Sequence, residues 1–189
     1  MDSALIVSAF EKSIVYVSEV LNAASIHDIS TVDTCGEARR LLMERSFDLV
    51  VINAPLRDES GEILSRNIAS QRISQVILIV KSEFYEEISA LTEEYGVLTV
   101  SKPMNRALLW AAVKFAKSAG AQLKSAREEN DKLKQKIEDI RIIDRAKCIL
   151  ISHLNMSEQR AHRYIEKQAM DMRSTKRTVA EGILKTYEN

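Results

Sequence analysis

The first hundred residues contain five short apolar runs that alternate with longer amphipathic stretches. Runs of this length, separated by helical patterns, predict the strands of a parallel sheet that is buried on both faces. The apolar runs lie at residues 4–8, 29–32, 48–53, 75–80 and 97–100, and helical patterns lie at 12–24 and 36–45. We therefore expect an α/β doubly wound domain with a five-stranded parallel sheet, in which ligands bind at the carboxyl ends of the strands.

Residues 105–152 contain no proline and a single glycine, which predicts a long helix. Within it, two sets of mostly apolar residues each repeat every seven positions, which is the pattern of the a and d positions of a coiled-coil heptad. The a positions are Leu123, Asn130 and Ile137, and the d positions are Ala126, Leu133 and Ile140. An asparagine at an a position favours a parallel dimer. We expect residues 121–140 to form a dimeric coiled coil, and a single amphipathic helix packed on its own domain is the alternative.

Residues 141–189 show the patterns of a small three-helix module. Ser157 is a suitable N-cap for one helix, and Ser174 or Thr175 for the last one. Because such short helices cannot bury a core alone, the end of the long helix should complete the module. We expect Tyr164 to pack, and Met170 to lie in the core. The predicted apolar stripes comprise Ala161, Ile165, Ala169 and Met172 in the first of these helices, and Val179, Ala180, Ile183 and Leu184 in the second.

The net charge of zero hides an asymmetry along the chain. Residues 1–140 carry 17 Lys/Arg and 21 Asp/Glu, whereas residues 141–189 carry 10 and 6. A basic C-terminal part favours a nucleic-acid partner, although many solvated helices reach this charge without one.

The cysteines, histidines and apolar segments exclude several classes of protein. Cys35 and Cys148 are isolated and form neither a disulfide framework nor a metal pattern, and His153 and His162 have no partners at metal spacing. No apolar run is long enough to cross a membrane, and the N-terminus lacks the basic segment of a secretory signal. We expect a cytoplasmic protein without cofactor, metal or membrane contact.

The order of elements, the segment DLVVINAPLRDESG and the pair Lys102-Pro103 resemble a response-regulator receiver domain. In that family an aspartate closes the third strand, eight residues before a glycine, and accepts a phosphoryl group. Here Asn53 stands at that position, eight residues before Gly61. An amide cannot form an acyl phosphate, so the nucleophile is absent.

The resemblance also implies a magnesium site, which the family builds from an acidic pair after the first strand. The matching residues here are Ser8 and Ala9. We therefore expect a pseudo-receiver without enzymatic activity, in which Lys102 is a structural or exposed residue and not a catalytic one. An active phospho-signalling receiver, with Asp48, Asp58 or Glu59 as substitutes, is the alternative.

The segment from Ile143 to Leu184 resembles an ANTAR domain, a family of transcription antitermination regulators, and the resemblance extends over about residues 136–188. The resemblance rests on Arg145-Ala146-Lys147, Ile149-Leu150, Ser157-Glu158, Ala161, Ala169-Met170 and Val179-Ala180, and Cys148 stands where the family usually has glycine. It implies binding to stem-loops in nascent leader RNA, which prevents the terminator hairpin from forming. The whole chain then divides into a receiver-like domain (1–120), a coiled coil (121–140) and an ANTAR-like module (141–189).

RNA loops are recognised through phosphate contacts and base stacking, so basic residues of this module are the candidate contacts. A homodimer would present two modules to two stem-loops. A regulatory protein that docks on the receiver-like domain is a further possible partner. The alternatives to RNA binding are a DNA-binding regulator and a dimeric protein-interaction scaffold. The candidate RNA-binding residues are Arg145, Lys147, Arg163, Arg173, Lys176 and Arg177.

Overall fold

The computed structural model describes residues 1–187, and the chain divides into two compact units, Met1–Lys124 and Ser125–Asn189. The first unit confirms the expected α/β fold, with a five-stranded sheet in the order β2-β1-β3-β4-β5. All neighbouring strands pair in parallel. The strands are β1 (Ser3–Val7), β2 (Asp28–Val32), β3 (Leu49–Asn53), β4 (Gln75–Lys81) and β5 (Leu98–Lys102). Each lies within about two residues of a predicted apolar run.

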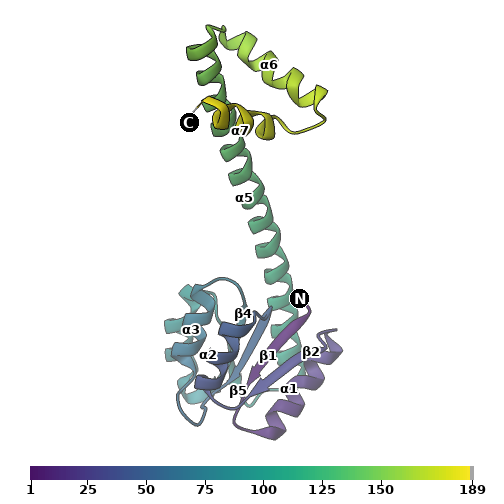
Figure 1. Cartoon of the computed structure of the whole chain (residues 1–189). Coiled ribbons are helices and arrows are strands. Elements are labelled where there is room, and N and C mark those ends of the chain that lie inside the picture. Colours follow the sequence, from purple (N-terminus) through teal and green to yellow (C-terminus); the bar gives the residue numbers. More distant parts are fainter. Residues whose placement is uncertain (188–189) are drawn as a thin grey trace. The chain divides into compact units, whose positions relative to one another are not determined.

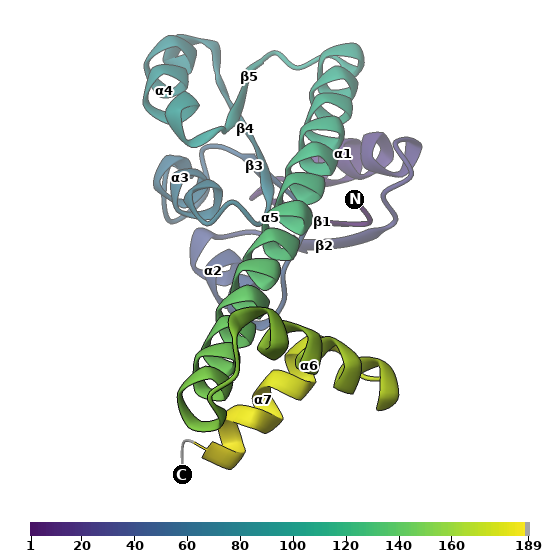
Figure 2. The ribbon, with the colours of Figure 1, turned by 90° about the horizontal axis from the view of Figure 1, so that it is seen from above.

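Helices cover both faces of this sheet (Figure 2). One face packs against α1 and the first part of α5, through residues such as Val20 and Val113. The other face packs against α2, α3 and α4, through residues such as Ala38 and Leu64. The helices of this unit are α1 (Glu11–Ala23), α2 (Cys35–Glu44), α3 (Glu62–Ser70), α4 (Tyr85–Thr92) and the beginning of α5 (Arg106–Leu154), with 3-10 turns η1 (Ser82–Phe84) and η2 (Glu93–Tyr95). Two-sided burial explains why β1, β3 and β4 are mostly apolar, whereas the edge strand β2 is partly exposed and more polar.

The second unit consists of the end of α5 with α6 (Glu158–Asp171) and α7 (Lys176–Tyr187) (Figure 1). Ser157 caps α6 by accepting a hydrogen bond from the amide of Arg160, as predicted. Thr175 caps α7 by accepting from the amide of Thr178 at 3.1 Å. The end of α5 completes the core of this unit, as expected for helices too short to fold alone. The buried core residues are Ala146, Leu150, Ala161, Ile165, Ala169, Val179, Ala180, Ile183 and Leu184.

Three side chains of α6 and its C-terminal turn correct the expected core. Met170 and Met172 were expected inside, but they are 78% and 65% exposed. The helical stripe of Ile165 and Ala169 would continue to Met172, but α6 ends at Asp171 and the chain turns away there. Tyr164 was expected to pack, but its side chain is 39% exposed.

The predicted coiled-coil stripe is exposed on α5. Leu133, Ile137 and Ile140 are 51%, 52% and 58% exposed, Asn130 is exposed, and Leu123 is half-buried. Dimerisation itself stays a prediction. No helix within residues 1–187 is both long and apolar enough to cross a membrane.

Candidate functional site

The carboxyl end of β3 carries Asn53, the residue at the phosphoacceptor position of receivers. Asn53 is 2% exposed, and its Nδ2 donates a hydrogen bond to Ser8 Oγ at 3.0 Å. The same hydroxyl oxygen accepts from the amide of Phe10 at 3.3 Å. These bonds tie the end of β3 to the loop between β1 and α1, where Ala9 follows Ser8.

A magnesium ion does not fit these residues. A hard divalent cation requires several oxygen ligands, mostly carboxylates. Ser8, Ala9 and Asn53 supply no carboxylate, and the Ser8 oxygen already accepts two N–H groups. The geometry therefore supports the interpretation of Asn53, Ser8 and Ala9 as degenerate positions.

Lys102 lies at the end of β5, beside the same strand end. Its Nζ donates to the carbonyl oxygen of Ala54 at 2.6 Å, which joins β5 to the loop after β3. Burial, together with the nearby charge of Lys81, holds the pKa of Lys102 below its usual value. The structural role expected for Lys102 agrees with this bond.

The acidic residues considered as substitute acceptors have structural contacts. Asp48 precedes β3, and its Oδ2 accepts from the amide of Asp2 at 2.7 Å. Asp58 accepts from the amides of Cys35 and Gly36, both at 3.0 Å, and thus caps the start of α2. Because Asp48 comes directly before β3 and Asn53 ends it, the two side chains lie at opposite ends of this strand.

Cys35, Asp58 and Glu59 form a cluster of potential metal ligands, which the sequence spacing did not indicate. Glu59 forms an ion pair with Arg39, and Asp58 is held by the backbone of α2. Burial raises the pKa of the Cys35 thiol to about 11, and the neighbouring carboxylates Asp58 and Glu59 add to that effect. Because Asp58 already accepts from two backbone amides and Glu59 is paired with Arg39, this cluster is better explained as packing between α2 and the loop after β3.

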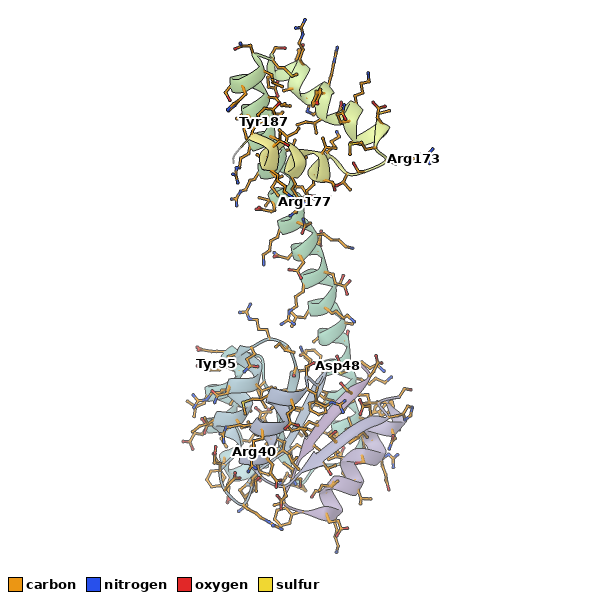
Figure 3. All side chains as sticks on the ribbon, viewed as in Figure 1. Arg40, Asp48, Tyr95, Arg173, Arg177 and Tyr187 are labelled. Carbon is orange, nitrogen blue, oxygen red and sulfur yellow. The ribbon has the colours of Figure 1, made fainter. Side chains whose placement is uncertain are left out.

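Three of the candidate cations in the second unit form ion pairs with other residues of the described part of the chain. Lys147 contacts Asp144 at 2.8 Å, and Lys176 pairs with Glu166. Arg177 contacts Asp139 at 2.8 Å, and this bond connects α7 to α5 (Figure 3). The hydrogen bond that Lys147 donates to the carboxylate of Asp144 raises the pKa of Lys147. Lys147 also donates to Glu158 of α6 at 3.2 Å, so that ion pairs connect α5, α6 and α7 to one another. Arg145 is exposed and is also engaged in a contact.

The outer face of α6 presents a second group of cations. Arg163 and Lys167 are exposed and belong to none of the ion pairs found within residues 125–187. Arg160, which the sequence analysis passed over, and Tyr164 share this face, because residues three, four and seven apart are neighbours on a helix. The buried face of α6 carries Ala161, Ile165 and Ala169.

Arg173 occupies an unusual backbone position at the turn after α6. Its φ is 48°, in the left-handed region where glycine is favoured. The amide of Ser174 donates to the carbonyl of Ala169 and that of Arg173 to Met170, which is a Schellman motif with arginine at the glycine position. The side chain is exposed and points outward at the tip of this turn (Figure 3). No sequence signal revealed this conformation, because it lacks the glycine that usually marks it.

A family comparison assigns the C-terminal part of the chain. Residues 131–184 match the family described as ANTAR domain. The chain is also 24% identical over 170 residues to the transcriptional regulatory protein PdtaR of two Mycobacterium tuberculosis strains. That similarity covers 90% of this chain and 83% of the relatives.

Solved structures similar to this chain are receiver domains. A signal receiver domain of an HD domain-containing protein from Pseudomonas fluorescens has a TM-score of 0.57 and 23% identity, over 67% of this chain and 92% of that one. A CheY-like receiver domain from Methylobacillus flagellatus has a TM-score of 0.52 and 21% identity, over 61% and 98%. At these identities the similarity establishes the receiver fold alone.

Proposed function

The chain has the architecture of an ANTAR response regulator, a receiver fold followed by an ANTAR domain, and from this premise we propose that it is an RNA-binding transcription antiterminator. It binds stem-loops in nascent leader RNA through its second unit and thereby prevents the terminator hairpin from forming. Binding stabilises one RNA fold by RT ln(1 + [L]/Kd), and the competing hairpin becomes less favourable by the same amount. The protein has no catalytic role in this process.

The outer face of α6 is the surface best suited to RNA. Arg163 and Lys167 supply positive charges whose contact with phosphates releases counterions. Tyr164 lies between them with an exposed ring, on which an unpaired loop base can stack. This combination of phosphate contacts and stacking matches a stem-loop better than duplex DNA, whose bases are stacked within the helix.

Arg173 carries the proposal most directly. A non-glycine residue in the left-handed region costs about 1 kcal/mol relative to glycine. Local backbone strain of this kind is often retained at functional sites. We propose that the guanidinium of Arg173 contacts a phosphate of the RNA and that this contact accounts for an arginine at this exposed turn.

The paired cations Lys147, Lys176 and Arg177 have a structural role in this arrangement, and their contact with RNA stays a prediction. They position α6 and α7 on the end of α5, and each retains N–H donors beyond those used in its ion pairs. Arg145 likewise stays a predicted contact. The RNA first contacts Arg163, Lys167 and Arg173, which form no ion pair with any residue from 1 to 187.

Dimerisation through α5 is part of the proposal. The exposed stripe of Leu133, Ile137 and Ile140 would be buried between two copies of the helix. Two modules on one dimer bind two stem-loops of the same transcript with a gain in effective concentration.

Control by a partner protein or ligand, and not by phosphorylation of its own receiver, completes the proposal. Asn53, Ser8 and Ala9 support it, because they offer neither an acceptor carboxylate nor a magnesium site. Exposure to a small phosphodonor is expected to leave the intact mass unchanged. A gain of one phosphoryl group that disappears in Asp58→Asn or Asp48→Asn would contradict it.

The binding surface is tested by titrating stem-loop RNA and duplex DNA over a salt series. The Arg163→Gln/Lys167→Gln variant is expected to lower the slope of log K against log [salt] by about 0.7 to 0.9 per lost contact. Lys132→Gln/Lys134→Gln removes two exposed charges from α5 and serves as the matched control. Equal slopes for both variants would contradict the assignment of this surface.

Arg173→Gly separates binding from stability. Glycine is the residue preferred at this backbone position, so the variant is expected to unfold at an equal or higher urea concentration. Its affinity for RNA is nevertheless expected to fall. Full RNA affinity in Arg173→Gly would show that the arginine does not serve binding. Preference for duplex DNA would favour the DNA-binding alternative, and failure to bind either nucleic acid would favour the scaffold.

A further inference from the structure

The end of α6 exposes three consecutive side chains whose chemistry differs from that of the cations beside them. Met170 and Met172 are 78% and 65% exposed. Asp171, between them, is exposed and forms no ion pair with any residue from 1 to 187. These thioethers and this carboxylate take no part in the core of the second unit, whose residues lie on the other face of α6.

This segment, residues 170–172, continues the cationic face of α6. Met170 follows Lys167 by three residues and Arg163 by seven, so the helix brings the three side chains to one face. Beyond the segment lies Arg173, whose amide donates to the carbonyl oxygen of Met170 at 3.2 Å and whose side chain points outward (Figure 3). The segment is therefore an apolar and acidic surface with cations on both sides.

Its chemistry suits a nucleobase and not a phosphate. The carboxylate of Asp171 repels a phosphate, and thioethers offer it no N–H group. The ring of a base is flat, aromatic and uncharged, and methionine sulfur makes favourable contacts with aromatic rings. A carboxylate also accepts hydrogen bonds from the N–H groups on the edge of a base, and in loops these edges are unpaired.

We propose that residues 170–172 recognise one unpaired base in the loop of the bound RNA. Met170 and Met172 pack against its ring, Asp171 accepts a hydrogen bond from an N–H group on its edge, and Lys167 and Arg173 hold the adjoining phosphates. The inference rests on the proposed RNA binding and adds a source of discrimination to it. Phosphate contacts supply affinity without regard to sequence, whereas base contacts distinguish one loop from another.

The test uses the full chain and a stem-loop from a leader that co-purifies with it. Met170→Gln/Met172→Gln replaces both thioethers with polar side chains of similar length and is expected to weaken binding about tenfold. Because both positions are exposed, urea unfolding should not change. Met43→Gln, at an 81% exposed position of α2, is the matched control and is expected to bind RNA like the unmodified protein.

A series of RNAs with one loop base removed at a time locates the contact. The loss of one particular base is expected to weaken binding to the unmodified protein, but to cause no further loss in the double methionine variant. Unchanged affinity in that variant, equal weakening in Met43→Gln, or the same further loss at every loop position would overturn the inference.

Asp171→Asn distinguishes base recognition from attraction of phosphates. The substitution removes a negative charge, so attraction of phosphates alone predicts tighter RNA binding. Recognition of a base predicts binding weakened about threefold or more, because a charge-assisted hydrogen bond becomes a neutral one. Tighter binding would overturn the inference while leaving the proposed function intact. If no stem-loop binds with a measurable salt slope, the proposed function fails and this inference fails with it.

Discussion

Substitution of the exposed stripe on α5 tests whether two chains associate through it. Leu133→Ala/Ile137→Ala removes two apolar side chains that are 51% and 52% exposed within the chain. Full burial of such a side chain stabilises by about 1.5–3 kcal/mol, so the half still available to a partner is worth roughly 1 kcal/mol. A symmetric dimer loses four of these side chains, roughly 4 kcal/mol, which corresponds to about a thousandfold increase in the dimer Kd.

The assay is sedimentation velocity over a range of protein concentrations. Alanine maintains helix propensity, so α5 is expected to stay helical and the weaker association to reflect lost contacts. Asp131→Ala/Lys132→Ala changes two exposed residues at b and c positions without altering the net charge, and is expected to dissociate like the unmodified protein. A Kd that rises less than about tenfold, or a protein that is monomeric at every concentration, would refute dimerisation through this stripe.

Three other substitutions or modifications test the local physical chemistry. Gly182→Ala is expected to stabilise the second unit by about 0.5–1 kcal/mol in urea unfolding, because a Cβ there would meet nothing within 4 Å; a loss of stability would show that α7 packs more closely at this position. Burial raises the pKa of Asp48, but bonds from the amides of Asp2 and Ser3 outweigh it and the pKa lies below its usual value. The carboxylate therefore contributes stability above its unfolded pKa, which is lost as pH falls through the folded pKa. Asp48→Asn is expected to lower the melting temperature at neutral pH but not in acid, where Asp48 itself is protonated. A decrease in melting temperature that is the same at every pH would show that the substitution acts through packing. Iodoacetamide is expected to modify exposed Cys148 before buried Cys35, whose pKa of about 11 keeps the thiol protonated. Mass spectrometry of peptides measures the order of modification, and earlier modification of Cys35 would contradict this prediction.

The elements that the sequence predicts well are those in which burial decides the pattern. β1, β3 and β4 are mostly apolar and buried because helices cover both faces of the sheet, so their apolar runs sufficed to locate them. The edge strand β2, with Asp28, Ser30 and Thr31, is partly exposed and gave a weaker signal. Ala161, Ala169 and Ala180 were also predictable as core residues, since only small side chains allow helices to pack this closely. Ser8, Ala9 and Asn53 were assigned to degenerate positions through the resemblance to receiver domains. The structure adds the hydrogen bond that Asn53 donates to Ser8.

The features that the sequence did not predict depend on contacts between distant residues or on backbone conformation. Arg177 and Asp139 are 38 residues apart, so their ion pair depends on how α7 packs against α5. Met172 fits the periodicity of α6 but lies beyond its end, and it is therefore exposed. Lys12, Tyr16 and Asn53 line one surface pocket, and their proximity depends on how α1 packs against the sheet.

Antitermination is tested most directly by the read-through of a terminator in vitro. Sequencing of RNA that co-purifies with the protein would first identify a leader with paired stem-loops, which then serves as the template. The account predicts that the protein increases the fraction of full-length transcript, and that Arg163→Gln/Lys167→Gln and Arg173→Gly reduce this increase while Lys132→Gln/Lys134→Gln does not. A terminated fraction that is unchanged by saturating protein would contradict it.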